Sequence, residues 1–150
     1  MLIDRYAIFR VYVESLSKNL QKYENKVMSE MGMRGIHALC LFHLGKSREG
    51  LTATQLATLC HVDKALISRT VSELSESGDV VRDMSGNGKY RSRIQLTLKG
   101  RQCLRKVTLE ICNSIRQMKD EITSEELETF YKVLVTLDRY LSDGRDTRGT

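Results

Sequence analysis

Apolar residues recur through residues 1–31 at a spacing that alternates between four and three. This spacing places them in one stripe along a single long helix, as in a coiled-coil seam. A small domain cannot cover a helix of that length, so we expect the stripe to pack on another long helix or a second subunit. Gly32 and Gly35 bracket the break that follows. The stripe consists of Leu2, Tyr6, Phe9, Val13, Leu16, Leu20, Tyr23 and Val27.

A second helix, over about 34–45, is apolar nearly all round. A helix without a clear polar face is buried. Gly45 is expected to end it, since glycine is common just after the last helical residue. The apolar positions are Ile36, Ala38, Leu39, Cys40, Leu41, Phe42 and Leu44.

Two short helices follow. Thr52 and Gln55 form a capping-box pattern that predicts a helix over 53–60, with Leu56, Ala57 and Leu59 facing inward. A tight turn over 60–63 leads to Asp63, a good N-cap for a helix over 64–77. Gly78 is expected to end that second helix. Its apolar face is made by Ile67, Val71 and Leu74.

The next segment predicts a β-hairpin. A short strand over 80–82 precedes a loop of turn-forming residues, and residues 90–96 then alternate between apolar and polar. Ile94 and Leu96 face one way along this second strand. Arg91, Arg93 and Gln95 face the other way, so the outer face of the hairpin is basic.

Two amphipathic helices complete the chain, and residues 143–150 form a polar tail that we expect to be disordered. Thr97 caps the first of these helices, and Thr123 with Glu126 forms a capping box for the second. The first carries a stripe of Leu104, Val107, Ile111, Ile115, Met118 and Ile122, and the second a stripe of Leu127, Phe130, Leu134, Leu137 and Leu141.

Two short helices joined by a tight turn and followed by a basic hairpin predict a winged helix-turn-helix. The fold class is therefore mainly α with a small β-hairpin wing. The second short helix has a small, polar face with two cations, which suits a major groove about 12 Å wide. Any solvated helix has polar residues, but the coincidence of helix, turn, helix and basic hairpin favours DNA binding. The face consists of Lys64, Ala65, Ser68, Arg69 and Ser72.

The charge distribution supports a polyanionic partner. The chain of 150 residues has a net charge of +5, and the basic excess is sharpest over 80–101. No stretch is apolar enough for a membrane span, and the absence of an export signal leads us to expect a cytoplasmic protein with reduced thiols. Residues 80–101 contain one acidic residue, Asp83, and six basic residues. The basic residues are Arg82, Lys89, Arg91, Arg93, Lys99 and Arg101.

Two segments resemble the MarR family of multiple-antibiotic-resistance regulators. Residues 51–82 begin with the pattern Leu-Thr-x-x-x-Leu-Ala, contain Val-Asp in the turn and end with Gly-x-Val-x-Arg. Residues 94–100, Ile-Gln-Leu-Thr-Leu-Lys-Gly, are similar to the segment that follows the wing in this family. Helix order and flanks fit over nearly the whole chain. The resemblance implies one domain over 1–150, with a winged helix-turn-helix at 34–97 between dimerisation helices at 1–31 and 98–142.

The resemblance also implies a homodimer in which two recognition helices read a pseudo-palindromic operator. It implies repression, often relieved by a small aromatic or anionic ligand between the dimer helices and the DNA-binding lobe. The dimer contacts would be Tyr6, Phe9, Val13 and Leu16 in the first helix with Leu127, Phe130, Leu134 and Leu137 in the last.

Two departures from the family pattern bear on the site. His61 stands in the turn where the family often has glycine, at a position that wants a left-handed backbone. Gly88, Lys89 and Tyr90 stand where the wing tip usually carries Asp-Arg-Arg, so the minor-groove cation is Lys89 or, by a shift, Arg91. The expected DNA contacts are therefore Lys64, Ala65, Ser68, Arg69, Ser72, Lys89, Tyr90, Arg91 and Arg93.

A ligand pocket is expected where the first two helices meet, with ordinary packing as the alternative for each residue. No cofactor or metal site is expected, because His37 and His43 lie off the i, i+4 spacing. Oxidant sensors of this family carry their cysteine in the first helix, and no cysteine precedes Cys40. No enzymatic motif is found, and the alternative to DNA binding is a winged-helix protein-interaction module. The pocket candidates are Tyr6, Arg10, His37 and Cys40.

Overall fold

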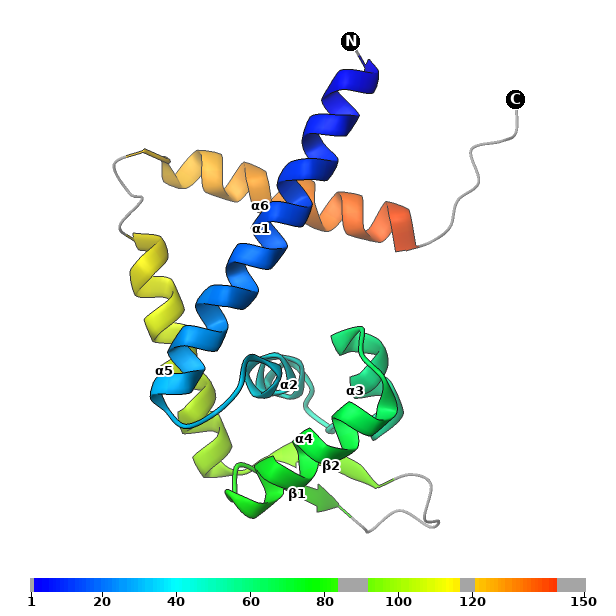
Figure 1. Cartoon of the computed structure of the whole chain (residues 1–150), viewed down its shortest axis with the longest axis vertical. Coiled ribbons are helices and arrows are strands. Elements are labelled where there is room, and N and C mark those ends of the chain that lie inside the picture. Colours follow the sequence, from blue (N-terminus) through cyan, green and yellow to red (C-terminus); the bar gives the residue numbers. More distant parts are fainter. Residues whose placement is uncertain (1, 84–91, 117–120, 143–150) are drawn as a thin grey trace, which may run out of the picture. The chain divides into compact units, whose positions relative to one another are not determined.

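The computed structural model describes residues 2–83, 92–116 and 121–142, which form six helices and a two-stranded hairpin in the chain order shown in Figure 1. This confirms the mainly helical fold class with a β-hairpin wing. Two compact units, Met1–Ile111 and Cys112–Thr150, are described separately. The elements are α1 (Leu2–Glu30), α2 (Gly35–Lys46), α3 (Ala53–Cys60), α4 (Lys64–Glu76), β1 (Val80–Asp83), β2 (Arg93–Leu96), α5 (Leu98–Arg116) and α6 (Ser124–Ser142).

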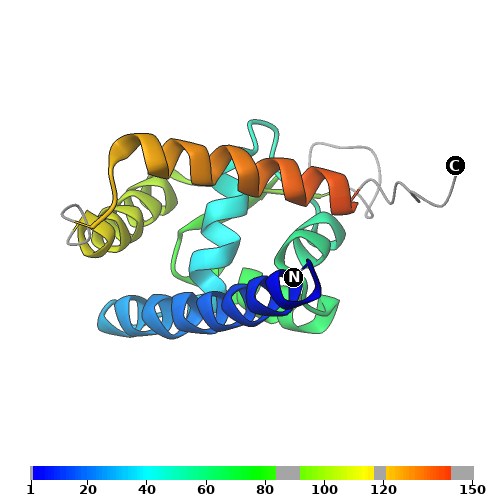
Figure 2. The same ribbon diagram turned by 90° about the horizontal axis from the view of Figure 1, so that it is seen from above.

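The core of the first unit forms around α2, which packs against α1, α3, α4 and β2. Only the last part of α1 enters this core, where Val27 and Met28 are buried. Figure 2 shows α1 as one unbroken helix. Most of its length therefore lies outside the core of its own unit.

Helix ends are set by local hydrogen bonds that the sequence indicates. The amide of Gly78 donates to the Ser75 carbonyl at 3.0 Å, and that of Asp79 to Leu74 at 2.8 Å. This is a Schellman motif, and it needs the left-handed backbone of Gly78, whose φ is 78°. Gly32, with φ 68°, ends α1 in the same way. Both helix ends confirm the predicted stops.

The predicted end of the second helix was wrong by one residue, because α2 includes Gly45 and runs on to Lys46. Gly45 does not end the helix, and its lack of a side chain instead makes room for a residue of α5. A Cβ at this position would lie 2.3 Å from Cδ2 of Leu104, which lies on α5. The absence of a side chain therefore lets α5 approach α2 closely.

The helix-turn-helix has the predicted caps. The hydroxyl of Thr52 accepts from the Gln55 amide at 3.2 Å, and the Gln55 side chain accepts from the Thr52 amide at 2.9 Å. A carboxylate oxygen of Asp63 accepts from the Leu66 amide at 2.8 Å and starts α4. Each cap satisfies helix-terminal amides that would otherwise lack partners.

His61 adopts the predicted left-handed conformation, with φ 54° and ψ 41°, at the C-terminal end of α3. His61→Val is expected to lower the free energy of unfolding by about 1 kcal/mol, because a β-branched residue tolerates this conformation poorly. His61→Asn is the matched control and should change the stability little, since asparagine visits this region readily. Chemical denaturation measures both, and equal stability of the two variants would contradict the assignment.

One inward-facing prediction in α3 was wrong. Leu56 and Ala57 are buried as expected, but Leu59 is 42% exposed and Cys60 is buried in its place. At about 100° per residue, Cys60 lies between Leu56 and Ala57 on the helix, whereas Leu59 lies about 60° beyond Leu56 and about 160° from Ala57, outside the buried arc. The apolar face predicted for α4 was correct, and the structure adds the fully buried Thr70 to it.

The hairpin pairs β1 with β2 in antiparallel register, with Val80 opposite Leu96 and Arg82 opposite Ile94. Ile94 and Leu96 are buried, which confirms the predicted inner face of the second strand. Leu51 adds an isolated bridge to Ile94. The hairpin is thereby fixed to the segment that enters α3. Residues 84–91, which include the predicted wing tip, lie outside the described residues.

Candidate nucleic-acid interface

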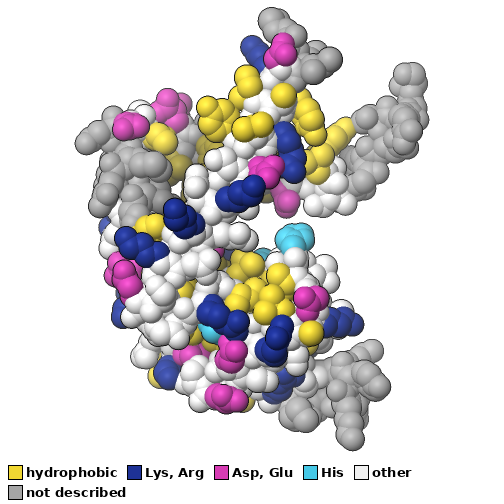
Figure 3. All heavy atoms as spheres, in the orientation of Figure 1, with side chains coloured by type: hydrophobic (Ala, Val, Ile, Leu, Met, Phe, Trp, Pro, Cys, Tyr) yellow, Lys and Arg dark blue, Asp and Glu magenta, His cyan; other side chains and the backbone are white. Residues whose placement is uncertain are grey.

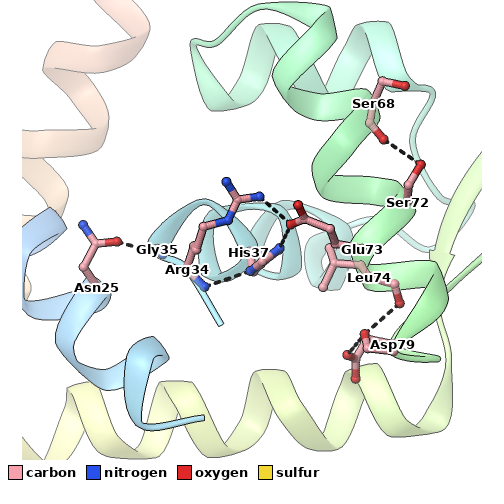
Figure 4. Close-up of polar contacts among 10 residues, drawn as sticks. Asn25, Arg34, Gly35, His37, Ser68, Ser72, Glu73, Leu74 and Asp79 are labelled. Atoms are coloured by element: carbon pink, nitrogen blue, oxygen red, sulfur yellow. Dashed lines mark hydrogen bonds and ion pairs between the residues drawn. The ribbon is translucent and has the colours of Figure 1, made fainter. Parts of the chain in front are cut away.

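Helix α4 separates the residues it buries from those it exposes. Ile67, Val71 and Leu74 are buried in the core. The five residues predicted to contact DNA are exposed on the opposite side, so the structure brings them together on one face. Ser72 donates its hydroxyl to the Ser68 carbonyl at 3.0 Å (Figure 4), which leaves its oxygen able to accept. The face consists of Lys64, Ala65, Ser68, Arg69 and Ser72.

The hairpin contributes one described residue of the predicted site. A guanidinium nitrogen of Arg93 donates to the Gly50 carbonyl at 3.1 Å and lies 3.7 Å from a carboxylate oxygen of Glu49. Arg93 therefore links β2 to the loop before α3. The other predicted wing residues, Lys89, Tyr90 and Arg91, lie outside the described residues.

The predicted dimer stripe of α1 is exposed over its N-terminal part. Leu16 is 51% exposed and Tyr6 is 67% exposed, while Phe9 and Val13 are also open to solvent. Figure 3 shows hydrophobic side chains gathered on this upper part of α1. Side chains this apolar on a helix surface mark an interaction site when they form a continuous patch.

Helix α6, in the second unit, likewise has no buried residue among those described. Its capping box is formed as predicted, with the Glu126 amide donating to the Thr123 hydroxyl at 3.2 Å. The apolar stripe that follows is open: Leu127, Phe130 and Leu134 are exposed, and Leu137 is half-buried. None of the described residues of its own unit buries this stripe.

In the described part of a single chain, the four predicted pocket residues do not lie together. Tyr6 and Arg10 are exposed on α1, and Arg10 pairs with Glu14 at 3.6 Å. The turn into α2 lies beside Asn25, fifteen residues and roughly 22 Å further along the helix. Cys40 is fully buried, and a hydrogen bond with Cys60, together with burial, raises the pKa of its thiol.

His37, the remaining pocket candidate, belongs to a polar cluster that sequence reasoning missed. Its Nε2 lies 2.7 Å from Oε2 of Glu73 on α4, and Arg34 bonds the same carboxylate oxygen (Figure 4). The hydrogen bond from Arg34, and then that with His37, lower the pKa of Glu73. The partners lie 36 and 39 residues from Glu73 in sequence, so no local pattern could have paired them.

This cluster borders a groove of about 830 Å³ between the α1–α2 turn, the end of α4 and the start of α5. Asp79 lies in its wall, 3% exposed, with one carboxylate oxygen accepting from Ser77 and the other without a hydrogen-bond partner among the described residues. Such a volume is within the range of small-molecule sites. The groove is lined by Met33, Arg34, Glu73, Asp79, Lys99 and Cys103, among others.

Residues 31–89 match the family model of the MarR family. Over 131 residues the chain is 25% identical to the HTH-type transcriptional regulator BilQ of Clostridioides difficile (strain CD3), covering 87% of this chain and 85% of that protein.

Two solved structures share the fold. A MarR family protein from Bacillus stearothermophilus has a TM-score of 0.77 at 17% identity, covering 95% of this chain and 99% of that one. CouR from Rhodococcus jostii RHA1, solved bound to p-coumaroyl-CoA, has a TM-score of 0.69 at 19% identity, covering 84% of this chain and 88% of that one.

Regulators of this family bind DNA and are not enzymes. None of the helices in the described ranges has the length and hydropathy that crossing a bilayer requires. The solved structures show that this chain has the winged helix-turn-helix fold of MarR family proteins, and the family match over residues 31–89 together with the regulator relative supports a DNA-binding regulator.

Proposed function

We propose that the protein is a sequence-specific repressor that binds a pseudo-palindromic operator as a homodimer, with one α4 in each of two successive major grooves. The observation that carries this proposal is the exposed face of α4, which combines small side chains with two cations directly opposite the buried face. A helix of this kind can lie deep in the major groove, because no bulky side chain holds it away from the bases.

Each residue of this face can contact a group of the DNA. Lys64 and Arg69 can bond guanine O6 and N7 or a phosphate, and Ala65 can contact a thymine methyl group. Ser68 and Ser72 can bond base edges or phosphates. Together they provide both the positioning contacts and the base contacts that specific binding needs.

The hairpin is proposed to contact the DNA beside the α4 site through Lys89, Tyr90 and Arg91. Arg93 would support this contact by fixing β2 to the loop before α3, where it bonds Gly50. Arg82, exposed on β1, adds to the local basic excess. A basic segment next to a recognition helix increases affinity through the phosphates without adding sequence preference.

The homodimer is proposed to form through the open stripes of α1 and α6. The residues involved would be those predicted from the sequence, and their exposure in the single chain supports this role. Burying exposed apolar side chains removes them from water at about 25 cal/mol per Å². The proposal requires that the paired copies present their two α4 helices at the spacing of two operator half-sites.

Release from the operator by a small ligand completes the proposal. The likeness to CouR, whose structure holds a CoA ester, supports a ligand-responsive regulator. The groove bordered by Arg34, Glu73 and Lys99 offers a site of suitable size within the first unit. A ligand that binds the free form better than the DNA-bound form would shift the protein off the operator.

Operator affinity is expected to fall steeply with salt. A dimer that neutralises six or more phosphates should lose about a thousandfold in affinity between 50 and 200 mM salt through counterion release. Fluorescence anisotropy with a labelled duplex measures this at several salt concentrations. A flat response in a folded dimer would exclude extensive phosphate contacts and would favour a winged-helix protein-interaction module instead.

A further inference from the structure

We propose that Arg34, His37 and Glu73 are positioning residues for DNA binding, which set the orientation of the recognition helix α4 against the end of the dimer helix α1. This inference rests on the proposed function, because it takes α4 as the element that reads DNA. The three residues lie outside the exposed α4 face and would act through the placement of that face.

Glu73 lies on the flank of α4, between the buried face and the exposed face. Its Oε2 receives the Arg34 guanidinium and lies 2.7 Å from Nε2 of His37. Figure 4 shows both side chains reaching from the start of α2 toward this one carboxylate. A single oxygen on α4 is thus held from two directions by one neighbouring element.

The ring of His37 is itself fixed. Its side chain is 8% exposed, and its Nδ1 accepts the backbone amide of Arg34 at 2.9 Å. A neutral ring that accepts at Nδ1 carries its proton on Nε2, so it donates to Glu73. The geometry therefore gives His37 one orientation and one tautomer, and it makes the contact with α4 directional.

The same end of α2 is joined to α1. The amide of Gly35 donates to Oδ1 of Asn25 at 2.8 Å. A Cβ at Gly35 would come within 2.4 Å of that oxygen, so a larger residue here would displace the Asn25 side chain from this hydrogen bond. Polar contacts therefore run from α1 through the start of α2 to the flank of α4 (Figure 4).

These polar contacts fix the orientation of α4 and contribute little to the stability of the fold. Arg34 and Glu73 have side chains that are 51% and 47% exposed, and such ion pairs contribute little to folding. The buried face of α4 already holds the helix in the core, but apolar contacts are not directional. The polar contacts restrict rotation of α4, which decides where its exposed residues point.

The restricted rotation of α4 is important when the protein binds DNA as a dimer. Two recognition helices must match half-sites about 34 Å apart, and a small misplacement of each weakens both contacts. Since α1 carries the proposed dimer stripe, a link from its end to α4 connects the geometry of the subunits to the reading face.

The test is a double-variant cycle with Arg34→Met and Glu73→Gln, using the full-length protein and a duplex that the wild-type protein enriches from random DNA. Arg34→Met alone is expected to weaken binding about tenfold, the scale of residues that couple a site to its surroundings. In the Glu73→Gln background it should change affinity less than about twofold, because the carboxylate that forms the ion pair with Arg34 is already gone. The cycle also cancels the charge that Glu73→Gln removes from near the DNA.

His37 provides a conservative rescue. His37→Leu keeps apolar packing but removes the donor to Glu73, and it should weaken binding as Arg34→Met does. His37→Gln retains an N–H donor at a similar reach and should recover most of the affinity. Arg105→Met, which removes an exposed arginine of α5 that no described residue pairs with, is the matched control and should bind as the wild type does.

The melting temperature separates orientation from stability. It should change by less than about 4 °C in Arg34→Met, because the lost pair is exposed. Equal losses of affinity in both backgrounds, unchanged affinity in Arg34→Met, or a melting temperature that falls in step with affinity would each overturn the inference. A wild-type protein that binds no duplex would instead overturn the proposed function, so the two failures are distinguishable.

Discussion

Leu16→Glu is expected to turn the dimer into monomers at micromolar concentration while leaving the helix content unchanged. Leu16 lies in the middle of the exposed α1 stripe and is 51% exposed in the single chain, so the substitution costs the protomer fold little. In the dimer it would bury a carboxylate in an apolar seam, and an unpaired buried charge costs several kcal/mol. Sedimentation equilibrium measures the dissociation constant, which should rise at least a hundredfold, or about 3 kcal/mol.

A glutamate on a different face of α1 provides the control for this result. Gln21→Glu introduces the same charge about one turn further along, away from the stripe, and should leave the dimer intact. Phe130→Glu tests the α6 stripe in the same way. A Leu16→Glu protein that remains dimeric at low micromolar concentration would refute the role of the α1 stripe.

Arg69→Ala is expected to weaken operator binding by about 10- to 100-fold, or roughly 1–3 kcal/mol, with fold and dimer unchanged. Arg69 is exposed on α4 and makes no ion pair with another described residue, so its loss removes a DNA contact and little else. Anisotropy titration measures the affinity, and Arg105→Ala serves as the control cation on α5. Equal affinities of the wild type and Arg69→Ala would remove Arg69 from the site.

The same variant distinguishes two ways in which Arg69 could bind. If it bonds a guanine, preference at one base position should relax while the others persist. If it bonds a phosphate, affinity should fall uniformly across sequences, and the salt slope should decrease by about 1. Measuring a panel of single-base operator variants therefore assigns its contact.

Structural features that depend on residues close together in the chain could be predicted from the sequence. Thr52 with Gln55 and Asp63 with Leu66 form their caps through short-range hydrogen bonds. The left-handed turn at His61 was expected from the resemblance, because the family often has glycine at this position. The buried face of α4 follows from its helical period, because the spacing of apolar residues alone determines which side they share.

Structural features that depend on residues far apart in the chain could not be predicted from the sequence. Glu73 is an ordinary surface glutamate in its own helix, and its contact with Arg34 joins residues 39 apart. Gly45 resembles a helix stop until Leu104 is seen to pack over it. Leu59 was misassigned because the helical period allows the buried arc of α3 to extend from Leu56 and Ala57 toward either Leu59 or Cys60, and only the packing of the neighbouring elements selects Cys60. In each case tertiary packing supplies information that local pattern lacks.

Selection of bound sequences from random duplex DNA, with the purified full-length protein, tests the central claim most directly. An inverted repeat should be enriched, with half-site centres that lie one helical turn, about 10 base pairs, or a multiple of it apart. A folded dimer that enriches no sequence at low salt would contradict sequence-specific binding by α4 and would favour the protein-interaction module.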